Sequence, residues 1–418
     1  MKKTLVLVLI GVLIFGVVAL SKTVTLTFFQ TLTSPERSAL WEKMIKDFEA
    51  THPNIKIKTI APPYEQAENK LSTMLMTKQP LDIVEVREIT LKQFVNNDWI
   101  IDLTPFINNW EDAKTITPVT WEIAKRVNNT PYVIPQNLFV KALYARTDIA
   151  EKYGINLDEI KTWQDLLKAC QKILDPSKNQ YGFDLRGKVF PLMFVELVVT
   201  SFVEDLNVEN PYLMANGETI FTSSGYKEGW EFYLKLSKTA PKDAINWGFS
   251  EQVNAFVSGI TPFLIQDPDA APFIAKVLDT SKFTALPLPV GPSGKTYQDF
   301  GFTSLAIPSY SKHKEAAWEF IKYVSSPEVN AWFNKNYGGL PIHSVTYQKD
   351  PYFSTGLYKA WDYMLSHPEK YPLVKYPFDS AKWPAWIGSI FQTDFQALLL
   401  GKLSLDEALK KWNEYWSK

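Results

Sequence analysis

The sequence has few of the residues and patterns that covalent and metal chemistry need. It contains one cysteine, Cys170, among 418 residues, which excludes an internal disulfide framework and a zinc site of four cysteines. Its four histidines stand singly in the sequence, and we interpret them as solvated turn residues rather than metal ligands. The nucleophile-elbow, zinc-protease and dinucleotide-binding patterns do not occur. The sequence therefore predicts no cofactor, no metal and no enzymatic activity.

An excess of one charge is also missing. The 44 lysines and arginines and the 45 aspartates and glutamates leave a formal net charge of -1. A protein that binds nucleic acid by neutralising phosphates needs a basic excess, so we expect no nucleic-acid partner. The 46% of hydrophobic residues can form a large core. The length exceeds the roughly 250–300 residues at which a single core stops growing, so we expect two domains.

Residues 1–21 have the layout of a secretory signal peptide. Positive charge at Lys2 and Lys3 precedes an apolar run from Leu5 to Leu20, and small residues near Ser21 suit cleavage. The alternative is an uncleaved membrane anchor, but this run is shorter than the roughly 20 residues that span a bilayer. No cysteine lies near the cleavage point, which excludes a lipid anchor. We therefore expect an exported, periplasmic protein that is not a lipoprotein.

Strand and helix patterns alternate after this segment. Apolar strand runs at 24–29, 55–58 and 82–86 are separated by helical patterns that start at Pro35 and near residue 65. This order predicts an α/β domain with a parallel sheet, and in such sheets ligands bind beyond the carboxyl ends of the strands. The residues that follow these strands are Gln30, Thr31, Tyr64, Arg87 and Glu88.

The rest of the chain continues the α/β pattern. We expect strands over 139–146 and 302–307, and a helix over 314–324. Capping patterns at Thr162 and Ser404 each start a further helix, and Cys170 lies on the apolar face of the first of these. The prolines in 283–290 favour a connection rather than a core strand.

Aromatic residues make up 14% of the chain and include 14 tryptophans. A pyranose stacks its C–H faces on flat rings and pairs its hydroxyl groups with amides, carboxylates and guanidinium groups. Stretches that combine rings or amides with charge are Pro135–Asn137, Asn246–Phe249, Gln266–Pro268 and Trp383–Trp386. Trp247, Trp383 and Trp386 lie in irregular segments and are our candidates for stacking. The tryptophans at helical or capping positions are assigned to the core: Trp41, Trp163, Trp318, Trp332, Trp412 and Trp416.

Ten short pieces, in this order, carry a family resemblance: Leu40–Ile57, Gln79–Val84, Asp98–Pro105, Tyr132–Pro135, Ala142–Tyr144, Thr162–Leu167, Phe256–Gly259, Leu286–Pro289, Ser311–Ile321 and Tyr337–Pro341. Together they resemble the extracellular solute-binding proteins of family 1, the maltose-binding-protein-like components of ABC importers. Two segments depart from the family pattern. Pro80-Leu81-Asp82 stands where the family usually has Gly-x-Pro-Asp, and Gln266–Asp269 stands where a strand usually ends in a tryptophan.

The resemblance implies the type II periplasmic-binding-protein fold, in which two α/β lobes, each a sheet flanked by helices, are joined by crossing hinge segments. By the family's topology the crossings fall near 137–141, 299–303 and 338–341. The N-terminal lobe would comprise residues 22–138 and 302–338, and the C-terminal lobe residues 139–301 and 339–418. The Trp383–Trp386 segment matches the place where the family has a sugar-stacking ring.

The resulting hypothesis is a monomeric substrate-binding protein that delivers a carbohydrate, with an oligosaccharide favoured, to an ABC transporter permease. The rings of Tyr64, Trp247, Trp383 and Trp386 would stack on the sugar. Its hydroxyl groups would bond to Gln30, Arg87, Glu88, Gln136, Asn137 and Asp267. Two alternatives stay open: a secreted glycoside hydrolase or lyase with two facing carboxylates, and a receptor or adhesion module without a permease.

Overall fold

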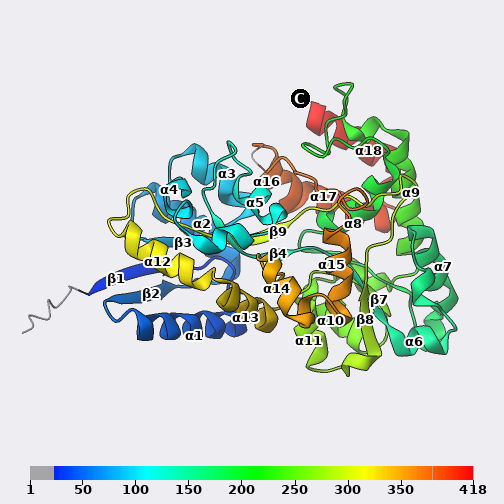
Figure 1. Ribbon diagram of the computed structural model, residues 1–418. Coiled ribbons are helices and arrows are strands. Elements are labelled where there is room, and N and C mark those ends of the chain that lie inside the picture. Colours follow the sequence, from blue (N-terminus) through cyan, green and yellow to red (C-terminus); the bar gives the residue numbers. More distant parts are fainter. Residues whose placement is uncertain (1–22, 379, 418) are drawn as a thin grey trace, which may run out of the picture.

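The computed structural model describes residues 23–378 and 380–417, and the expected signal peptide lies outside this range. Figure 1 shows two lobes side by side, with the N-terminal strands in one and the C-terminal helix in the other. Within the described residues, no helix combines the length and the apolar character that crossing a membrane requires. The α/β fold class predicted from the sequence is confirmed, because each lobe contains a sheet flanked by helices.

The first lobe contains a five-stranded sheet. Its strands, in spatial order, are β2 (Ile55–Ile60), β1 (Val24–Phe29), β3 (Ile83–Arg87), β9 (Gly301–Ala306) and β4 (Ile134–Phe139). β1 runs parallel to both β2 and β3, as the strand–helix alternation predicted, whereas β9 is antiparallel to β3 and β4. Since β9 lies between β3 and β4, a late part of the chain completes the first sheet.

Seven helices belong to this lobe among the described residues: α1 (Pro35–Thr51), α2 (Tyr64–Met76), α3 (Glu88–Asn96), α4 (Thr104–Ile107), α5 (Pro118–Ala124), α12 (Lys314–Val324) and α13 (Pro327–Tyr337). α1 begins where predicted, because the Ser34 side chain accepts from the Arg37 amide and Pro35 occupies the first turn. Trp41 on α1 packs edge-on against Phe28 of β1, with ring centroids 4.9 Å apart. The centroid of the Trp41 ring also lies 6.4 Å from that of Phe320 of α12 and 5.3 Å from that of Phe333 of α13, so α1 and these two late helices share one core.

The second lobe contains a four-stranded sheet in the order β6 (Phe183–Asp184), β7 (Phe263–Gln266), β5 (Ala142–Arg146) and β8 (Phe283–Leu286). Two expectations are wrong here. The strand run predicted over 139–146 is two strands in different lobes, because the chain crosses between them at Val140 and Lys141. Residues 283–286 form an edge strand paired with β5 rather than a connection, and the prolines follow it.

The helices of the second lobe surround this sheet and extend beyond it to the C-terminus. They are α6 (Thr147–Lys152), α7 (Trp163–Ile173), α8 (Leu192–Val199), α9 (Ser224–Ser237), α10 (Phe249–Val257), α11 (Ala270–Ala275), α15 (Lys359–Leu365), α16 (Trp383–Ala385), α17 (Phe391–Leu399) and α18 (Leu405–Ser417). The predicted capping boxes at Thr162 and Ser404 both form. Cys170 and Trp412 are buried, as expected.

Three passages connect the lobes. The first is Val140–Lys141, between β4 and β5, and the second is Asp299–Phe300, just before β9. The third begins at Gly338, but the chain stays against the first lobe beyond the expected boundary at 339. Ile342 packs in the first-lobe core, and His343 contacts Thr115 through a hydrogen bond of 2.7 Å. Helix α14 (Ser344–Lys349) then leads toward the second lobe.

Candidate functional site

A cavity of about 760 Å³ is lined by residues of both lobes and of the crossing segments. Its volume is typical of sites for small organic ligands, which span roughly 300–1,000 Å³. A second cavity of about 750 Å³ is lined by the second lobe alone, around β8 and α15. Volume therefore does not distinguish the two. Only the first cavity would bring the lobes into contact with the same ligand, and we treat it as the candidate site.

The first-lobe wall is built where β3 ends and α3 begins. Arg87, the last residue of β3, donates to the Tyr64 hydroxyl at 3.0 Å and lies 3.4 Å from a Glu88 oxygen. Burial disfavours the charge on Arg87, but Glu88, Tyr64 and Glu68 outweigh this and raise its pKa. Burial raises the pKa of Glu68 to about 7, although Arg87 opposes the shift. The wall thus offers carboxyl groups held around a single guanidinium group.

The second-lobe wall is built where β5 and β7 meet. Asp267 follows the last residue of β7, and Lys141 precedes β5, so the antiparallel pairing brings them together. The Lys141 ammonium lies 3.3 Å from Asp299 and 3.8 Å from Asp267. Burial and the negative charge of Asp267 raise the pKa of Asp269 to about 7. One oxygen each of Asp267 and Asp269 is buried without a hydrogen-bond partner among the described residues.

Arg186, just after β6, belongs to the same wall. Its guanidinium carbon lies 4.5 Å from the ring centroid of Phe194, and Lys141 lies 5.2 Å from that same centroid. Its Nε and Nη1 atoms are buried and meet no acceptor in the described part of the chain. Because β6 and β7 are parallel, Arg186 and Asp267 lie at the same edge of the second sheet. This edge therefore gathers both donors and acceptors.

Aromatic rings line the remaining wall of the cavity. They are Tyr64, Phe139, Phe190, Phe194, Phe249, Phe302, Phe378 and Trp383. Phe190 is 40% exposed, and it follows Val189 in a left-handed backbone conformation, with φ of 61° and 58° respectively. Such angles are unfavourable for β-branched and bulky residues and occur mainly where a structure holds them for function. The loop therefore presents an exposed ring at the cavity rim.

Five of the ten predicted site residues lie in this cavity: Tyr64, Arg87, Glu88, Asp267 and Trp383. The other five do not line it. Trp383 is itself almost buried, and its ring packs edge-on against Phe378 with centroids 5.0 Å apart. Its indole Nε1 has no hydrogen-bond partner in the described structure. Only part of this ring is therefore available to a ligand.

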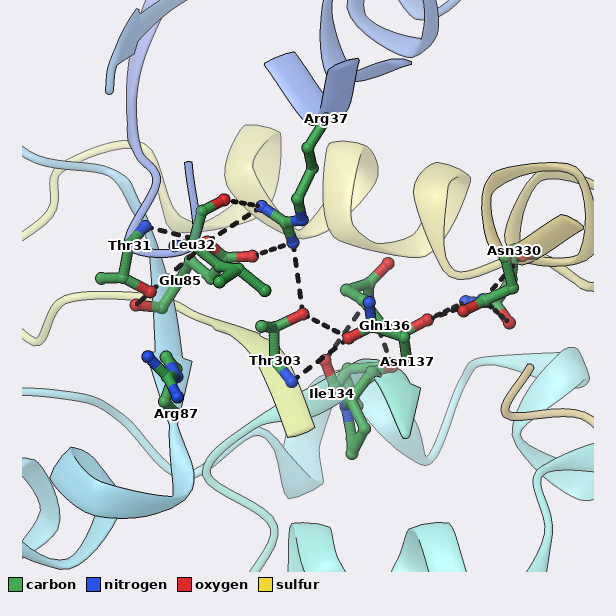
Figure 2. A network of polar contacts seen from close by, with 12 residues as sticks. Thr31, Leu32, Arg37, Glu85, Arg87, Ile134, Gln136, Asn137, Thr303 and Asn330 are labelled. Atoms are coloured by element: carbon green, nitrogen blue, oxygen red, sulfur yellow. Dashed lines mark hydrogen bonds and ion pairs between the residues drawn. The ribbon is translucent and has the colours of Figure 1, made fainter. Parts of the chain in front are cut away.

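Gln30, Gln136 and Asn137 are buried away from the cavity. Figure 2 shows Asn137 accepting from Thr303, which in turn accepts from Arg37, while Arg37 is paired with Glu85. The Gln136 amide donates to Ser325 at 2.6 Å, and its backbone carbonyl accepts from Asn330 and Asn334. This network joins β3, β4 and β9 beside the crossing segments. The hydrogen bonds that we expected Gln136 and Asn137 to offer a sugar connect strands and helices instead.

Trp247 and Trp386 also lie outside the cavity lining. Trp386 is 0% exposed and packs among Tyr212, Trp412 and Tyr415. Its segment is a π-helix, Trp386–Ile390, rather than an irregular loop. Trp247 is half-buried beside the cavity residue Gly248, and its indole nitrogen donates to Asp243 at 3.2 Å. Neither ring faces the cavity.

The histidine interpretation needs one correction. His343 is fully buried, with hydrogen bonds to Thr115 and to the Ser325 carbonyl at 2.6 Å, so it is a core residue and not a solvated turn residue. No cluster of three potential metal ligands occurs among residues 23–378 and 380–417.

Several cavity residues were missed by the sequence analysis. Most of the rings are phenylalanines, whereas the candidates were chosen among tryptophans. Lys141 and Asp299 lie in the first two crossing segments, and their ion pair joins residues 158 positions apart in the sequence. Asp269 stands in the segment that departs from the family pattern, and that departure was an available signal. Arg186 carried no signal beyond its position after a short strand.

Comparisons with known proteins agree with this architecture. The model of the bacterial extracellular solute-binding proteins matches residues 33–331. The arabinooligosaccharide-binding protein of Bacillus subtilis is 26% identical over 299 residues, which cover 68% of this chain and 66% of the relative.

Two solved structures share the fold. A solute-binding protein from Thermotoga lettingae, bound to α-D-tagatose, has a TM-score of 0.77 and 23% identity and covers 94% of this chain and 98% of its own. A substrate-binding protein from Listeria monocytogenes, in complex with cycloalternan, has a TM-score of 0.78 and 19% identity. The match covers 94% of this chain and 97% of the Listeria protein. The family match spans most of the chain, and the two-lobed fold and the cavity between the lobes accompany it. This chain belongs to the bacterial extracellular solute-binding proteins.

Proposed function

We propose that this protein binds a carbohydrate between its lobes and delivers it to the permease of an ABC importer. The observation that carries the proposal is the cavity itself, in which flat rings alternate with carboxyl, guanidinium and ammonium groups from both lobes. Rings suit the C–H faces of a sugar, and the charged groups suit its hydroxyl groups. The relatives that bind arabinooligosaccharides, tagatose and cycloalternan support the same ligand class.

An oligosaccharide is the favoured ligand. Eight rings line a cavity of about 760 Å³, so a chain of several sugar units would use more of this surface than one ring would. A ligand that contacts Arg87 on one lobe and Asp267 on the other makes its full set of contacts only when the lobes approach. Binding therefore shifts the population toward a closed form, which the permease recognises.

Calorimetric titration tests the ligand class. The panel consists of D-tagatose, mannitol, maltotriose and arabinotriose, with spermidine and a tetrapeptide as controls. We expect at least one saccharide to bind with micromolar or tighter affinity and to reduce the radius of gyration in solution scattering. Binding of spermidine or the peptide, with no response to any saccharide, would contradict the proposal.

A glycoside hydrolase is the second candidate, and one observation favours it. Glu68 and Asp269, on opposite walls of the cavity, both have a pKa raised to about 7, which is the state that a general acid needs. We favour binding without cleavage because the chain belongs to a family of solute-binding proteins. Overnight incubation with maltotriose and arabinotriose separates the two functions: we expect both to be recovered intact, whereas released sugars would indicate an enzyme.

We further propose that the chain is exported through a cleaved signal peptide and acts in the periplasm as a monomer without a lipid anchor. The layout of residues 1–21 supports export and cleavage. Mass spectrometry of the mature protein should show an N-terminus near Lys22 and no lipid, and light scattering should report one chain per particle. Retention of residues 1–21 would indicate a membrane anchor instead.

A further inference from the structure

Arg186 is a buried cation that meets no hydrogen-bond acceptor among residues 23–378 and 380–417. The residue is 8% exposed, and its Nε and Nη1 atoms are buried and find no hydrogen-bond acceptor within the described range. No ion pair connects it to any described residue, and its guanidinium group rests on the ring of Phe194. Taking a charge out of water is unfavourable unless an acceptor replaces the water. The chain itself provides no such acceptor here.

The acidic groups that face Arg186 come from three elements: Asp184 on β6, Asp267 and Asp269 after β7, and Glu251 on α10. Two of these four are engaged elsewhere. One Asp184 oxygen accepts from the Thr261 hydroxyl at 2.7 Å, and the other is buried without a partner in the described part of the chain, but Asp184 does not line the cavity. Glu251 pairs with Lys188 at 3.1 Å. Asp267 and Asp269 each keep one buried oxygen without a hydrogen-bond donor among the described residues. Unpaired donors and unpaired acceptors therefore lie on the same wall.

The unpaired donors and acceptors together indicate which chemical group of a ligand could form hydrogen bonds with this wall. A carboxylate on a ligand would pair with Arg186 but would meet Asp267 and Asp269 with like charge. An ammonium group would pair with these two carboxyl groups but would meet Arg186 and Lys141 with like charge. A hydroxyl group accepts from a guanidinium and donates to a carboxylate at the same time. A pair of neighbouring hydroxyl groups can therefore bond to the unpaired atoms of Arg186, Asp267 and Asp269.

Building on the proposed function, we propose that Arg186 is the specificity-determining residue of the second lobe. It donates to the oxygen of a sugar hydroxyl group whose own proton is accepted by Asp267 or Asp269. The sugar unit lodged at this wall must therefore carry free neighbouring hydroxyl groups. A site built to bond a hydroxyl group strongly rejects an analogue that lacks it, because buried polar atoms are then left unpaired.

Arg146 provides a matched control. It lies in the same lobe at the end of β5 and is 7% exposed, almost the same as Arg186. Its guanidinium group is fully engaged: it donates to both Asp148 oxygens at 2.9 and 2.8 Å and to the carbonyls of Phe256 and Val257 at 2.9 and 3.0 Å. The two arginines thus differ in their partners rather than in their burial.

Thermal unfolding without ligand is the first test. Arg186→Met removes an unpaired buried charge and should raise Tm by about 2 °C or more, whereas Arg146→Met should lower it by at least as much. This result would show that the free protein is destabilised by Arg186 and that the residue is kept for a ligand. A fall in Tm for Arg186→Met comparable to that of Arg146→Met would overturn the proposal, since Arg186 would then support the fold.

Titration with maltotriose and arabinotriose is the second test. For whichever binds the wild type, Arg186→Met should weaken binding by about 10- to 100-fold. Arg186→Lys, which keeps the charge, should have an affinity between those of the wild type and of Arg186→Met. Arg146→Met should leave the affinity unchanged. Unchanged affinity in Arg186→Met would overturn the proposal. If no saccharide of the panel binds the wild type, the proposed function fails. The unfolding comparison is independent of this result and still shows whether Arg186 destabilises the free protein.

Discussion

Two buried arginines in this chain have opposite surroundings. Arg37, in the first lobe, donates through both terminal nitrogens, to Glu85, to the Leu32 carbonyl and to Thr303 (Figure 2), and only its Nε meets no acceptor in the described part of the chain. Arg186, in the cavity wall of the second lobe, meets no acceptor among the described residues. Buried polar groups in native proteins are normally paired. An unpaired buried charge that also lines the cavity, as at Arg186, is therefore a candidate for contact with a ligand, whereas the paired guanidinium group of Arg37 supports the scaffold.

The same comparison explains the mixed outcome of the site prediction. Gln136 and Asn137 are amides beside a crossing segment, as a sugar site requires, but their hydrogen bonds go to Ser325 and Thr303. Asp267 was chosen by the same reasoning, and one of its oxygens has no hydrogen bond to the described chain. Asn137 also has an atom unpaired in the described structure, its buried Nδ2, so what separates the two cases is that Asp267 lines the cavity and the two amides do not.

The largest expected effect comes from breaking the paired arginine. Arg37→Met leaves Glu85 as an uncompensated buried charge, and it should lower the free energy of unfolding by about 3–5 kcal/mol. Denaturant unfolding measures this. Lys43→Ala, which removes an exposed pair with Asp47 on the same helix, should change stability by less than about 0.5 kcal/mol. Similar effects of the two variants would contradict the scaffold role of the Arg37 network.

A smaller effect is expected from Trp386, a predicted stacking residue that the structure places in the core. Trp386→Phe removes the indole donor to the Tyr212 hydroxyl at 3.0 Å, and the buried hydroxyl then loses its partner at a cost of about 1–3 kcal/mol of stability. The affinity for the saccharide that binds in the titration panel should stay within twofold. A large loss of affinity without a loss of stability would contradict this prediction and would indicate that Trp386 contacts the ligand.

The pH dependence of stability tests the unpaired wall. Burial raises the pKa of Glu68 and of Asp269 to about 7, so the folded protein keeps two protons that the unfolded chain releases near pH 4. Between about pH 4 and pH 7 the folded state binds more protons, and stability must therefore fall as pH rises through this window. The charged groups around them are Glu85, Arg87, Glu88, Lys141, Arg186 and Asp267.

The Glu68→Gln, Asp269→Asn double variant should remove this slope and gain about 1–2 kcal/mol at pH 7.5 relative to the wild type. Unfolding at pH 4.5 and pH 7.5 measures both quantities. Asp158→Asn, on the second cavity, is the control and should leave the slope as it is. If the stability of the double variant depends on pH in the same way as that of the wild type, groups other than Glu68 and Asp269 determine the pH dependence.

The smallest effect on the fold is expected at the cavity rim. Phe190→Gly removes an exposed ring and relieves a left-handed backbone conformation with φ of 61°. Stability should change by less than about 1 kcal/mol, because the two terms oppose each other. Saccharide affinity should fall by about fivefold or more as a stacking surface is lost. Leu213→Ala removes another exposed apolar side chain, outside the cavity, and should leave affinity unchanged.

Local signals predicted much of the fold. The strand at 24–29 and the helix at 314–324 were placed at their observed bounds, because alternation and apolar spacing define them without help from distant residues. The strand at 283–286 was missed because the strand that pairs with it, β5, lies more than a hundred residues away in sequence. The local pattern read 139–146 as one strand because the apolar Val140 looks like part of a continuous run, and the crossing near 137–141 was expected only from the family resemblance. Pairing and crossing are long-range properties that a local pattern does not contain.

The site was predictable where topology alone determines it. Arg87 and Glu88 were expected near a ligand because they follow the carboxyl end of a parallel strand, and they line the candidate cavity. The tryptophans were less predictable, since a ring in a segment rich in proline and glycine was taken to be exposed. At Trp386 that segment forms a π-helix packed against α18. Whether a ring is covered depends on a helix that arrives 20 or more residues later, and no local pattern reports it.

The position of β9 between β3 and β4 also bears on how the chain reaches its native form. β4 lacks its ladder partner β9, and β3 lacks the neighbour on its other side from β1, until residues 301–306 have been synthesised, so a shorter nascent chain cannot complete the first sheet. Contacts so distant in sequence are formed slowly. The first lobe therefore cannot reach its final form before most of the chain has been made.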